Sequence, residues 1–253
     1  MINKKLKKVA FIPARSGSKR IKDKNIYPLD NHPLLAYTIC SAVESKIFDS
    51  IICATDSIKY AEIAKYYGAE VPFLRDTKIS DDKSADLEWL TWAVEMLNSQ
   101  GRNFDIFSIL RPTSPLRQVS TLNRAFAEFL SGENIDSLRA VEKCHQHPGK
   151  MWVISGSTMQ PLLPFMNGSV PWHSSQYDSL PEIFIQNASL EIAWTKTLIN
   201  KKSISGEIVM PFITKSFEGF DINYPEDLNL LGELIKCKKV KLPKINKSSY
   251  FDM

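Results

Sequence analysis

The residues in this sequence best suited to chemistry follow its first apolar segment. Val9–Pro13 is apolar enough for a buried strand, and the chain then turns abruptly small and basic. The following loop contains Gly17 and the cations Arg15, Lys19, Arg20, Lys22 and Lys24. Bare backbone N–H groups and cationic side chains at one place bind polyphosphates. We therefore predict a phosphate-binding loop; the alternative is a solvated basic loop on an ordinary α/β domain.

Three further polar clusters follow other predicted strands. They are Thr55-Asp56, Arg111 to Arg117, and Phe220-Asp221-Ile222-Asn223. In an open parallel sheet, ligands bind outside the carboxyl ends of the strands, so these clusters are expected to share one rim with the basic loop. Cations for phosphates and a carboxylate for Mg²⁺ would suit a nucleotide with a divalent metal.

Alternating strand and helix patterns must position these clusters. Apolar runs predict strands at 9–13, 50–55, 70–74, 104–110, 183–194 and 207–213. Residues 70–74 are expected at a sheet edge because Pro72 lacks an N–H group. Helical spacing predicts helices that begin near Pro33, Asp56 (as N-cap), Leu87, Leu122 and Pro225. This alternation indicates an α/β fold, a mostly parallel sheet covered by helices on both faces.

The pattern changes between residues 142 and 182. This segment is rich in Pro and Gly, shows no helical period, and carries aromatic residues such as Trp152, Phe165 and Trp172. We predict a small excursion of irregular strands whose apolar residues are buried by a partner subunit. The expected organisation is a core in two parts, 1–141 and 183–253, interrupted by an insertion at 142–182.

Composition limits the class of protein. The chain has 253 residues, 43% hydrophobic and 24% charged, with a net charge of +4. This permits an anionic small molecule but is too mild, and too dispersed, for a nucleic-acid binder. The four cysteines are scattered, and no apolar stretch is long enough to span a membrane. We predict a soluble, cytoplasmic protein.

Common catalytic motifs are absent from the sequence. There is no GxxxxGK[ST] or GxGxxG, which argues against a P-loop enzyme and a nicotinamide dehydrogenase, and no GxSxG, which argues against a serine hydrolase. Cys144, His145 and His147 are crowded on one extended stretch without a fourth ligand, so a zinc site is disfavoured.

Five motifs in order along the chain resemble those of one enzyme family. They are IPARSGSKRIKDKN, LRPTSPLR, HPGKMW, QNASLEI and FDINYPEDL. Together they resemble the acylneuraminate cytidylyltransferases, also called CMP-nonulosonate (CMP-sialic acid) synthetases, over nearly the whole chain up to about Ile235. The resemblance implies a three-layer, Rossmann-like nucleotidyltransferase fold, and it implies that the insertion serves dimerisation.

The resemblance also implies roles for individual residues. The CTP-binding residues would be Arg15, Ser18, Lys19, Lys24, Asn25 and Ser84. The sugar-binding residues would be Thr113, Ser114, Arg117 and Asn187, together with Arg111 and Glu191 at positions where this chain departs from the family. The metal ligands would be Asp221 and Asn223, holding Mg²⁺.

The implied reaction is nucleotidyl transfer from CTP to the anomeric hydroxyl of a nonulosonic acid, carried out by a homodimer. Catalysis would rest on positioning and charge neutralisation, with Arg15, Lys19 and Lys24 stabilising charge on the phosphates. The alternatives are a nucleotidyltransferase for a Kdo-like sugar acid or another nucleotide, and a nucleotide-binding relative without turnover.

Several departures from the family pattern fall on the sugar side. Asn223 replaces the second aspartate of a DID motif, and Arg111 stands where the family often has Gln. Because a sugar carboxylate pairs best with a bidentate arginine, we assign Arg111 to that carboxylate. Glu191 is expected near the site or on the opposite face of the sheet. These changes favour a modified bacterial nonulosonate as the substrate.

Overall fold

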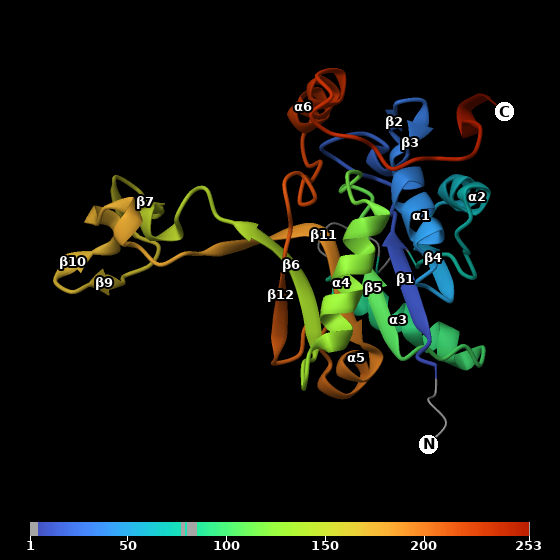
Figure 1. Ribbon diagram of the computed structural model, residues 1–253, viewed down its shortest axis with the longest axis horizontal. Helices are drawn as coiled ribbons and strands as arrows, with labels where there is room; N and C mark the ends of the chain where they lie inside the picture. Colours follow the sequence, from blue (N-terminus) through green and yellow to red (C-terminus); the bar gives the residue numbers. More distant parts are fainter. Residues whose placement is uncertain (1–4, 77–78, 80–84, 253) are drawn as a thin grey trace. The chain divides into compact units, whose positions relative to one another are not determined.

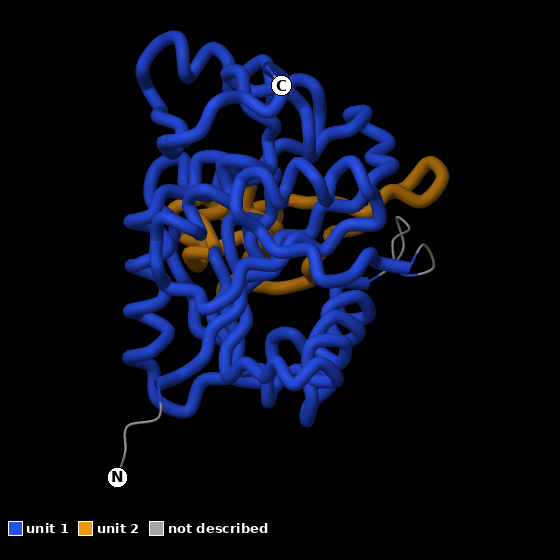
Figure 2. The backbone as a smooth tube through the Cα atoms, turned by 90° about the vertical axis from the view of Figure 1, so that its right-hand side faces the viewer, with its two compact units in different colours: residues 1–140, 187–253 blue, residues 141–186 orange. Residues whose placement is uncertain are grey.

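The computed structural model of the chain describes residues 5–76, 79 and 85–252. The chain forms two compact units, shown in different colours in Figure 2. Unit 1 consists of residues 1–140 and 187–253, and unit 2 of residues 141–186. The insertion predicted at 142–182 lies within unit 2. No helix among the described residues is long and apolar enough to cross a membrane.

A six-stranded sheet forms the centre of unit 1, with the strand order β12-β6-β11-β5-β1-β4. Its strands are β1 (Lys8–Pro13), β4 (Ser50–Ala54), β5 (Ile106–Ile109), β6 (Ser137–Lys143), β11 (Phe184–Trp194) and β12 (Val209–Ile213). Strand β1 pairs in parallel with both β4 and β5, whereas β11 runs antiparallel to β5. The carboxyl ends of β1, β4 and β5 therefore lie at one edge of the sheet. Because β11 runs the opposite way and Glu191 pairs with Ile109 at the end of β5, the part of β11 before Glu191 extends beyond this edge.

Helices cover both faces of this sheet (Figure 1). They are α1 (Leu34–Ser45), α2 (Ile58–Tyr67), α3 (Asp86–Ser99), α4 (Val119–Ser131), α5 (Thr195–Lys201) and α6 (Pro225–Lys236). Ala10 and Ile12 of β1 pack with α1, α2 and α4, while Val9 and Phe11 pack with α3. Because successive side chains of a strand point to opposite faces, this alternation creates two separate cores. The predicted three-layer α/β fold is confirmed.

Two local predictions are wrong. Ser57, not Asp56, caps α2, since the Ser57 side chain accepts a hydrogen bond from the backbone N–H of Tyr60. Residues 70–74 form no strand; only Glu70 makes an isolated bridge, to Ile52. The chain leaves the sheet edge immediately, at the proline-containing segment that follows. Gly68, with φ of 108°, ends α2 in a conformation that an L side chain rarely adopts.

Helix α6 begins as the sequence predicts, at Pro225. The Asp227 carboxylate accepts hydrogen bonds from the backbone N–H groups of Asn223 and Tyr224, at 2.7 and 2.8 Å. Leu231 of α6 packs with Ile222 and Ile21 in a third apolar cluster. This cluster joins the Asp221 segment to the basic loop that follows β1.

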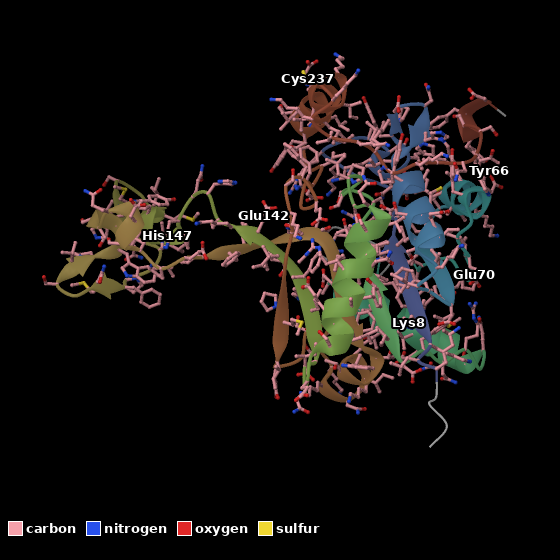
Figure 3. The ribbon with its side chains drawn as sticks, in the orientation of Figure 1. Lys8, Tyr66, Glu70, Glu142, His147 and Cys237 are labelled. Atoms are coloured by element: carbon pink, nitrogen blue, oxygen red, sulfur yellow. The ribbon has the colours of Figure 1, made fainter. Side chains whose placement is uncertain are left out.

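The lysine-rich C-terminal segment is not the solvated tail that its composition suggests. Val240, Leu242 and Ile245 pack against the third cluster. Further along, the Tyr250 ring lies 5.5 Å from that of Tyr66, and its backbone N–H donates to the Tyr67 hydroxyl at 3.0 Å. Figure 3 shows Tyr66 on α2 beside this segment. The spaced apolar residues dock the segment while its lysines stay exposed.

Unit 2 consists of short hairpins and single turns of 3₁₀-helix. Strands β7 (Trp152–Ser155) and β8 (Thr158–Pro161) form one hairpin, and β9 (Met166–Asn167) and β10 (Val170–Pro171) form another. His147, labelled in Figure 3, lies among aromatic side chains; its ring is 5.5 Å from that of Trp172. Its Nδ1 accepts a hydrogen bond from the backbone N–H of Gly149 at 3.0 Å. Its Nε2 lies 3.1 Å from the Pro181 carbonyl oxygen. His147 thus holds a turn together.

Docking of the C-terminal segment predicts unequal effects for two neighbouring aromatic residues. Tyr250→Ala should lower the free energy of unfolding by about 1–2 kcal/mol, because it removes an edge-on ring pair and packing against α2. Phe251 is 47% exposed. Phe251→Ala should therefore change the free energy of unfolding by less than about 0.5 kcal/mol. Urea denaturation measures both, and equal effects would contradict the docking.

Candidate active site

The basic loop after β1 is anchored by Asp56, which follows β4. The Asp56 carboxylate accepts hydrogen bonds from the Ser16 backbone N–H at 2.7 Å and from the Ser16 hydroxyl at 2.8 Å. Gly17 follows with φ of 73°, a left-handed conformation in which a side chain would be strained. Asp56 therefore fixes where the loop turns, and the loop conformation depends on a residue from the neighbouring strand.

The end of the loop is tied both to its own start and to a distant segment. Asn25 donates a hydrogen bond to the Arg15 carbonyl oxygen at 3.0 Å. Lys24 donates to the Ile222 carbonyl oxygen at 2.9 Å. Burial lowers the pKa of Lys24, and the nearby Asp221 carboxylate opposes this effect. A partly desolvated ammonium group interacts more strongly with a phosphate than a solvated one.

Two adjoining cavities open beside this loop, and both are lined by Arg15, Ser18 and Lys24. The first has a volume of about 270 Å³ and is also lined by Arg75, Arg111 and Thr113. The second has a volume of about 500 Å³ and is also lined by Lys19, Arg20 and Asn223. The second cavity is thus surrounded by four cationic side chains and one amide, which suits a polyphosphate.

Asp221 and Asn223 lie between β12 and α6 and reach the loop through backbone bonds. The Ile222 N–H donates to the Thr113 carbonyl oxygen at 2.9 Å. The Asn223 side chain donates to Asp221 Oδ2 at 2.6 Å. Asp221 Oδ1 is buried and has no hydrogen-bond partner among the described residues. Such an oxygen has an unused ligand position for a cation.

Arg117 lies beneath the site rather than in it. Its side chain is fully buried and donates to the Ser189 carbonyl oxygen, to Thr38 Oγ1 at 2.9 Å and to the Arg111 carbonyl oxygen at 3.1 Å. Burial lowers the pKa of the Arg117 guanidinium. The predicted contact between Arg117 and a sugar does not fit this geometry, because the N–H groups of the Arg117 guanidinium are directed at acceptors within the protein. Arg117 instead supports the loop that carries Arg111 and Thr113.

Arg111 and Glu191, which lie 80 residues apart, form an ion pair at 2.7 Å. The same Arg111 nitrogen, Nη2, also lies 2.7 Å from Asp86 Oδ2. This arrangement argues against the assignment of Arg111 to a sugar carboxylate, because the guanidinium group is already paired with two protein carboxylates. Glu191 lies on the same face of the sheet as Arg111, close to the site.

The remaining predicted residues occupy different positions. Thr113 lines the first cavity, whereas Ser114 is buried beside it, with no partner for its hydroxyl among the described residues. Asn187 donates to the Thr214 hydroxyl at 2.9 Å and is not among the residues lining the two cavities. Ser84 lies outside the described residues.

Sequence reasoning missed Arg75, Asp86 and Trp89. All three line the first cavity. The Arg75 guanidinium lies 5.0 Å from the centre of the Trp89 ring, and the Trp89 Nε1–H donates to Asp86 Oδ1 at 2.7 Å. Arg75 is an isolated arginine after a proline-containing segment, and nothing in its neighbouring sequence indicates that it lines a cavity. Asp86 is also the first residue of α3, where an acidic side chain is expected for its favourable interaction with the helix N-terminus.

Comparison with known proteins identifies the family of this chain. The sequence profile of the cytidylyltransferase family matches residues 9–148. The chain belongs to the cytidylyltransferase family. It is 39% identical over 129 residues to the pseudaminic acid cytidylyltransferase of Campylobacter jejuni, covering 51% of this chain and 56% of that protein. A second Campylobacter jejuni enzyme of the same name is likewise covered over only 56% of its length.

Other relatives align over most of the chain. The CMP-N,N'-diacetyllegionaminic acid synthase of Legionella pneumophila is 29% identical, with 92% of this chain and 98% of that protein covered. The N-acylneuraminate cytidylyltransferase of Streptococcus agalactiae is 34% identical, with 90% of this chain and 54% of that protein covered.

Solved structures show the same fold at low identity. The CMP:2-keto-3-deoxy-manno-octonic acid synthetase complexed with CTP superposes with a TM-score of 0.67 at 13% identity, covering 92% of this chain and 99% of the other. A cytidylyltransferase from Leptospira borgpetersenii superposes with a TM-score of 0.57 at 16% identity, covering 97% and 100%. These likenesses support the nucleotidyltransferase fold and nothing finer.

The burial of Arg117 predicts a loss of stability on its replacement. Arg117→Met should lower the free energy of unfolding by about 3–5 kcal/mol, because it leaves several buried acceptors without a donor. Arg102, whose side chain is 30% exposed where it pairs with Glu70, offers a matched control. Arg102→Met should cost about 1 kcal/mol or less. If Arg117→Met lost activity at wild-type stability in urea denaturation, Arg117 would contact substrate instead.

Proposed function

We propose that this chain transfers a cytidylyl group from CTP to a nonulosonic acid. The observation that carries the proposal is that hydrogen bonds join the basic loop, the Arg111–Arg117 loop and the Asp221 segment around two adjoining cavities. The relatives named for pseudaminic, legionaminic and N-acylneuraminic acids supply the class of sugar.

The reaction balances as an in-line displacement at phosphorus. The anomeric hydroxyl oxygen of the sugar acid forms a bond to the α-phosphorus of CTP while the α–β phosphoanhydride bond breaks. Pyrophosphate leaves, and the hydroxyl proton passes to solvent or to a base. The protein contributes positioning and charge, as in other phosphoryl-group transfers.

The basic residues around the second cavity would hold the β- and γ-phosphates. Arg15, Lys19 and Lys24 are the catalytic candidates, because all three line this cavity and would neutralise charge on the departing pyrophosphate. Arg20 lines it too, and its guanidinium lies 4.9 Å from the centre of the Tyr224 ring. Asn25 and Ser18 would complete the CTP site beside the first cavity.

Asp221 and Asn223 would hold Mg²⁺. The buried, unpartnered Asp221 Oδ1 fits a cation, and the adjacent amide of Asn223 offers a neutral oxygen ligand. The described residues contain no cluster of three or more acidic, His or Cys ligands. This small donor set suits Mg²⁺, which commonly takes one or two carboxylates together with substrate phosphates. When bound, the ion would neutralise phosphate charge and help to acidify the attacking hydroxyl.

We also propose a homodimer formed through unit 2. Apolar side chains of this unit are exposed in the single chain, including Ile154 at 76% and Met159 at 58% on the β7-β8 hairpin. An apolar surface of this kind indicates an interface. We place the protein in the cytoplasm, where its four free cysteines would remain reduced.

A pyrophosphate-release assay tests the activity. With Mg²⁺, CTP and a nonulosonic acid we expect turnover, with other nucleoside triphosphates or octulosonic acids much less, and with EDTA none. Lys24→Met should lower kcat by about 10²–10³-fold, because it removes a desolvated cation from the phosphate site. Lys59→Met, an exposed lysine on α2, should retain wild-type activity. If CTP binds but no pairing of substrates turns over, the proposed function is wrong.

Light scattering after size-exclusion chromatography tests the dimer. The wild-type chain should have twice its monomer mass of 28.7 kDa. Ile154→Asp combined with Met159→Asp should give a monomer, because buried unpaired carboxylates oppose association. Ile58 on α2 is 67% exposed, and Ile58→Asp should leave the mass unchanged. A monomeric wild-type protein at micromolar concentration would contradict the dimer.

A further inference from the structure

Four charged side chains form a continuous row at the edge of the first cavity. Arg111 Nη2 lies 2.7 Å from Asp86 Oδ2 and 2.7 Å from Glu191 Oε1. The second oxygen of Glu191, Oε2, lies 3.0 Å from Arg139 Nη2. Asp86 Oδ1 accepts a hydrogen bond from Trp89. Glu191 therefore bridges two arginines, while Asp86 fixes the cavity end of the row.

The sheet explains why residues so distant in sequence meet. Arg139 lies on β6, Glu191 on β11 and Arg111 just after β5, and these three strands are neighbours. Glu191 is directly opposite Ile109, two residues before Arg111. Since residues two apart share a face, all three side chains lie on the face that α3 covers, and Asp86 is the first residue of α3.

Arg111 keeps unused donors. Its Nη2 serves both carboxylates, whereas its Nε and Nη1 make no hydrogen bond with the described part of the chain. The buried nitrogens without a partner among the described residues include Nε of Arg75 and of Arg117, but no atom of Arg111. The free N–H groups of Arg111 are therefore open to solvent, on a residue that lines the first cavity.

The row carries no net charge. It contains two carboxylates and two guanidinium groups, and Glu191 is the most buried of them, with only 7% of its side chain exposed. Although burial opposes it, the carboxylates of Glu191 and Asp86 raise the pKa of Arg111, so its guanidinium group stays protonated. A substrate carboxylate near Arg111 would meet a guanidinium group that is already paired with two protein carboxylates.

We propose, on the basis of the proposed function, that Glu191 is a positioning residue. Together with Asp86 it clamps the Arg111 side chain in one orientation, in which Arg111 donates a hydrogen bond to an uncharged oxygen of the sugar. The uncharged oxygen belongs to a hydroxyl or acyl carbonyl group, and the carboxylate of the sugar is bound elsewhere. This replaces the assignment of Arg111 to the carboxylate. It also explains why an arginine and a glutamate occur together at two positions where the family pattern has other residues.

Two replacements of Arg111 separate geometry from charge. Arg111→Lys keeps the charge but loses the planar fork, whereas Arg111→Gln loses the charge and keeps a planar amide donor. The proposal predicts that Arg111→Gln retains more kcat/KM for the sugar acid than Arg111→Lys, by about 5-fold or more, a difference of about 1 kcal/mol. If Arg111→Lys is the more active variant, charge recognition is the role and the proposal is wrong.

Replacing Glu191 tests the clamp. Glu191→Gln should raise the KM for the sugar acid at least about 5-fold and leave the KM for CTP within about 2-fold, because the orientation of Arg111 is lost while the phosphate loop is untouched. The double variant Glu191→Gln/Arg111→Gln should recover part of this loss through an amide pair. Glu218, which binds Arg124 on α4 outside both cavities, offers the matched control, Glu218→Gln.

The outcomes distinguish this inference from the proposed function. If wild-type protein turns over no sugar acid, the proposed function fails, and calorimetric binding of a nonulosonic acid in the presence of CTP then compares the Arg111 variants directly. Absence of binding overturns both. If Glu191→Gln and Glu218→Gln change the KM values equally, or only lower the unfolding midpoint, Glu191 has a structural role and the clamp is refuted.

Discussion

The site depends on one buried cation. The Arg117 side chain donates hydrogen bonds to β11, to α1 and to the carbonyl oxygen of Arg111. The Ser41 hydroxyl of α1 donates in turn to the carbonyl oxygen of Arg117, at 3.1 Å. Removing a guanidinium from water costs several kcal/mol unless acceptors replace the lost hydration. The loop from Arg111 to Arg117 must therefore close on these acceptors in one way. That closure fixes Thr113, whose carbonyl oxygen binds Ile222 and so places Asp221.

Carboxylates keep the other cations of the site in position, each by a different contact. Asp56 holds the start of the basic loop through Ser16, and Asp221 lies near the partly buried ammonium group of Lys24. Asp86 and Glu191 neutralise Arg111. Cations therefore line both cavities, and in the first of them Arg111 is paired with two carboxylates, whereas the second has no carboxylate among its described lining residues.

Local patterns predicted the elements that depend on local physics. The apolar run at Val9–Pro13 and the proline that begins α6 each act within a few residues, and the structure places them as expected. Contacts between distant residues were not predictable in this way. An aspartate after a strand is typical of a helix cap, and only tertiary structure turns Asp56 toward Ser16. The pairing of Arg111 with Glu191 requires knowledge of strand order, since β11 pairs antiparallel with β5.

The position of unit 2 in the chain has an evolutionary consequence. The chain leaves unit 1 along β6 and returns along β11, and these strands are neighbours in the sheet. The 46 residues from Val141 to Gln186 are thus one continuous segment inserted between two adjacent strands of the sheet. Such an excursion can be lengthened, shortened or exchanged while the strand order is kept. Natural variation can therefore remodel this segment independently of unit 1.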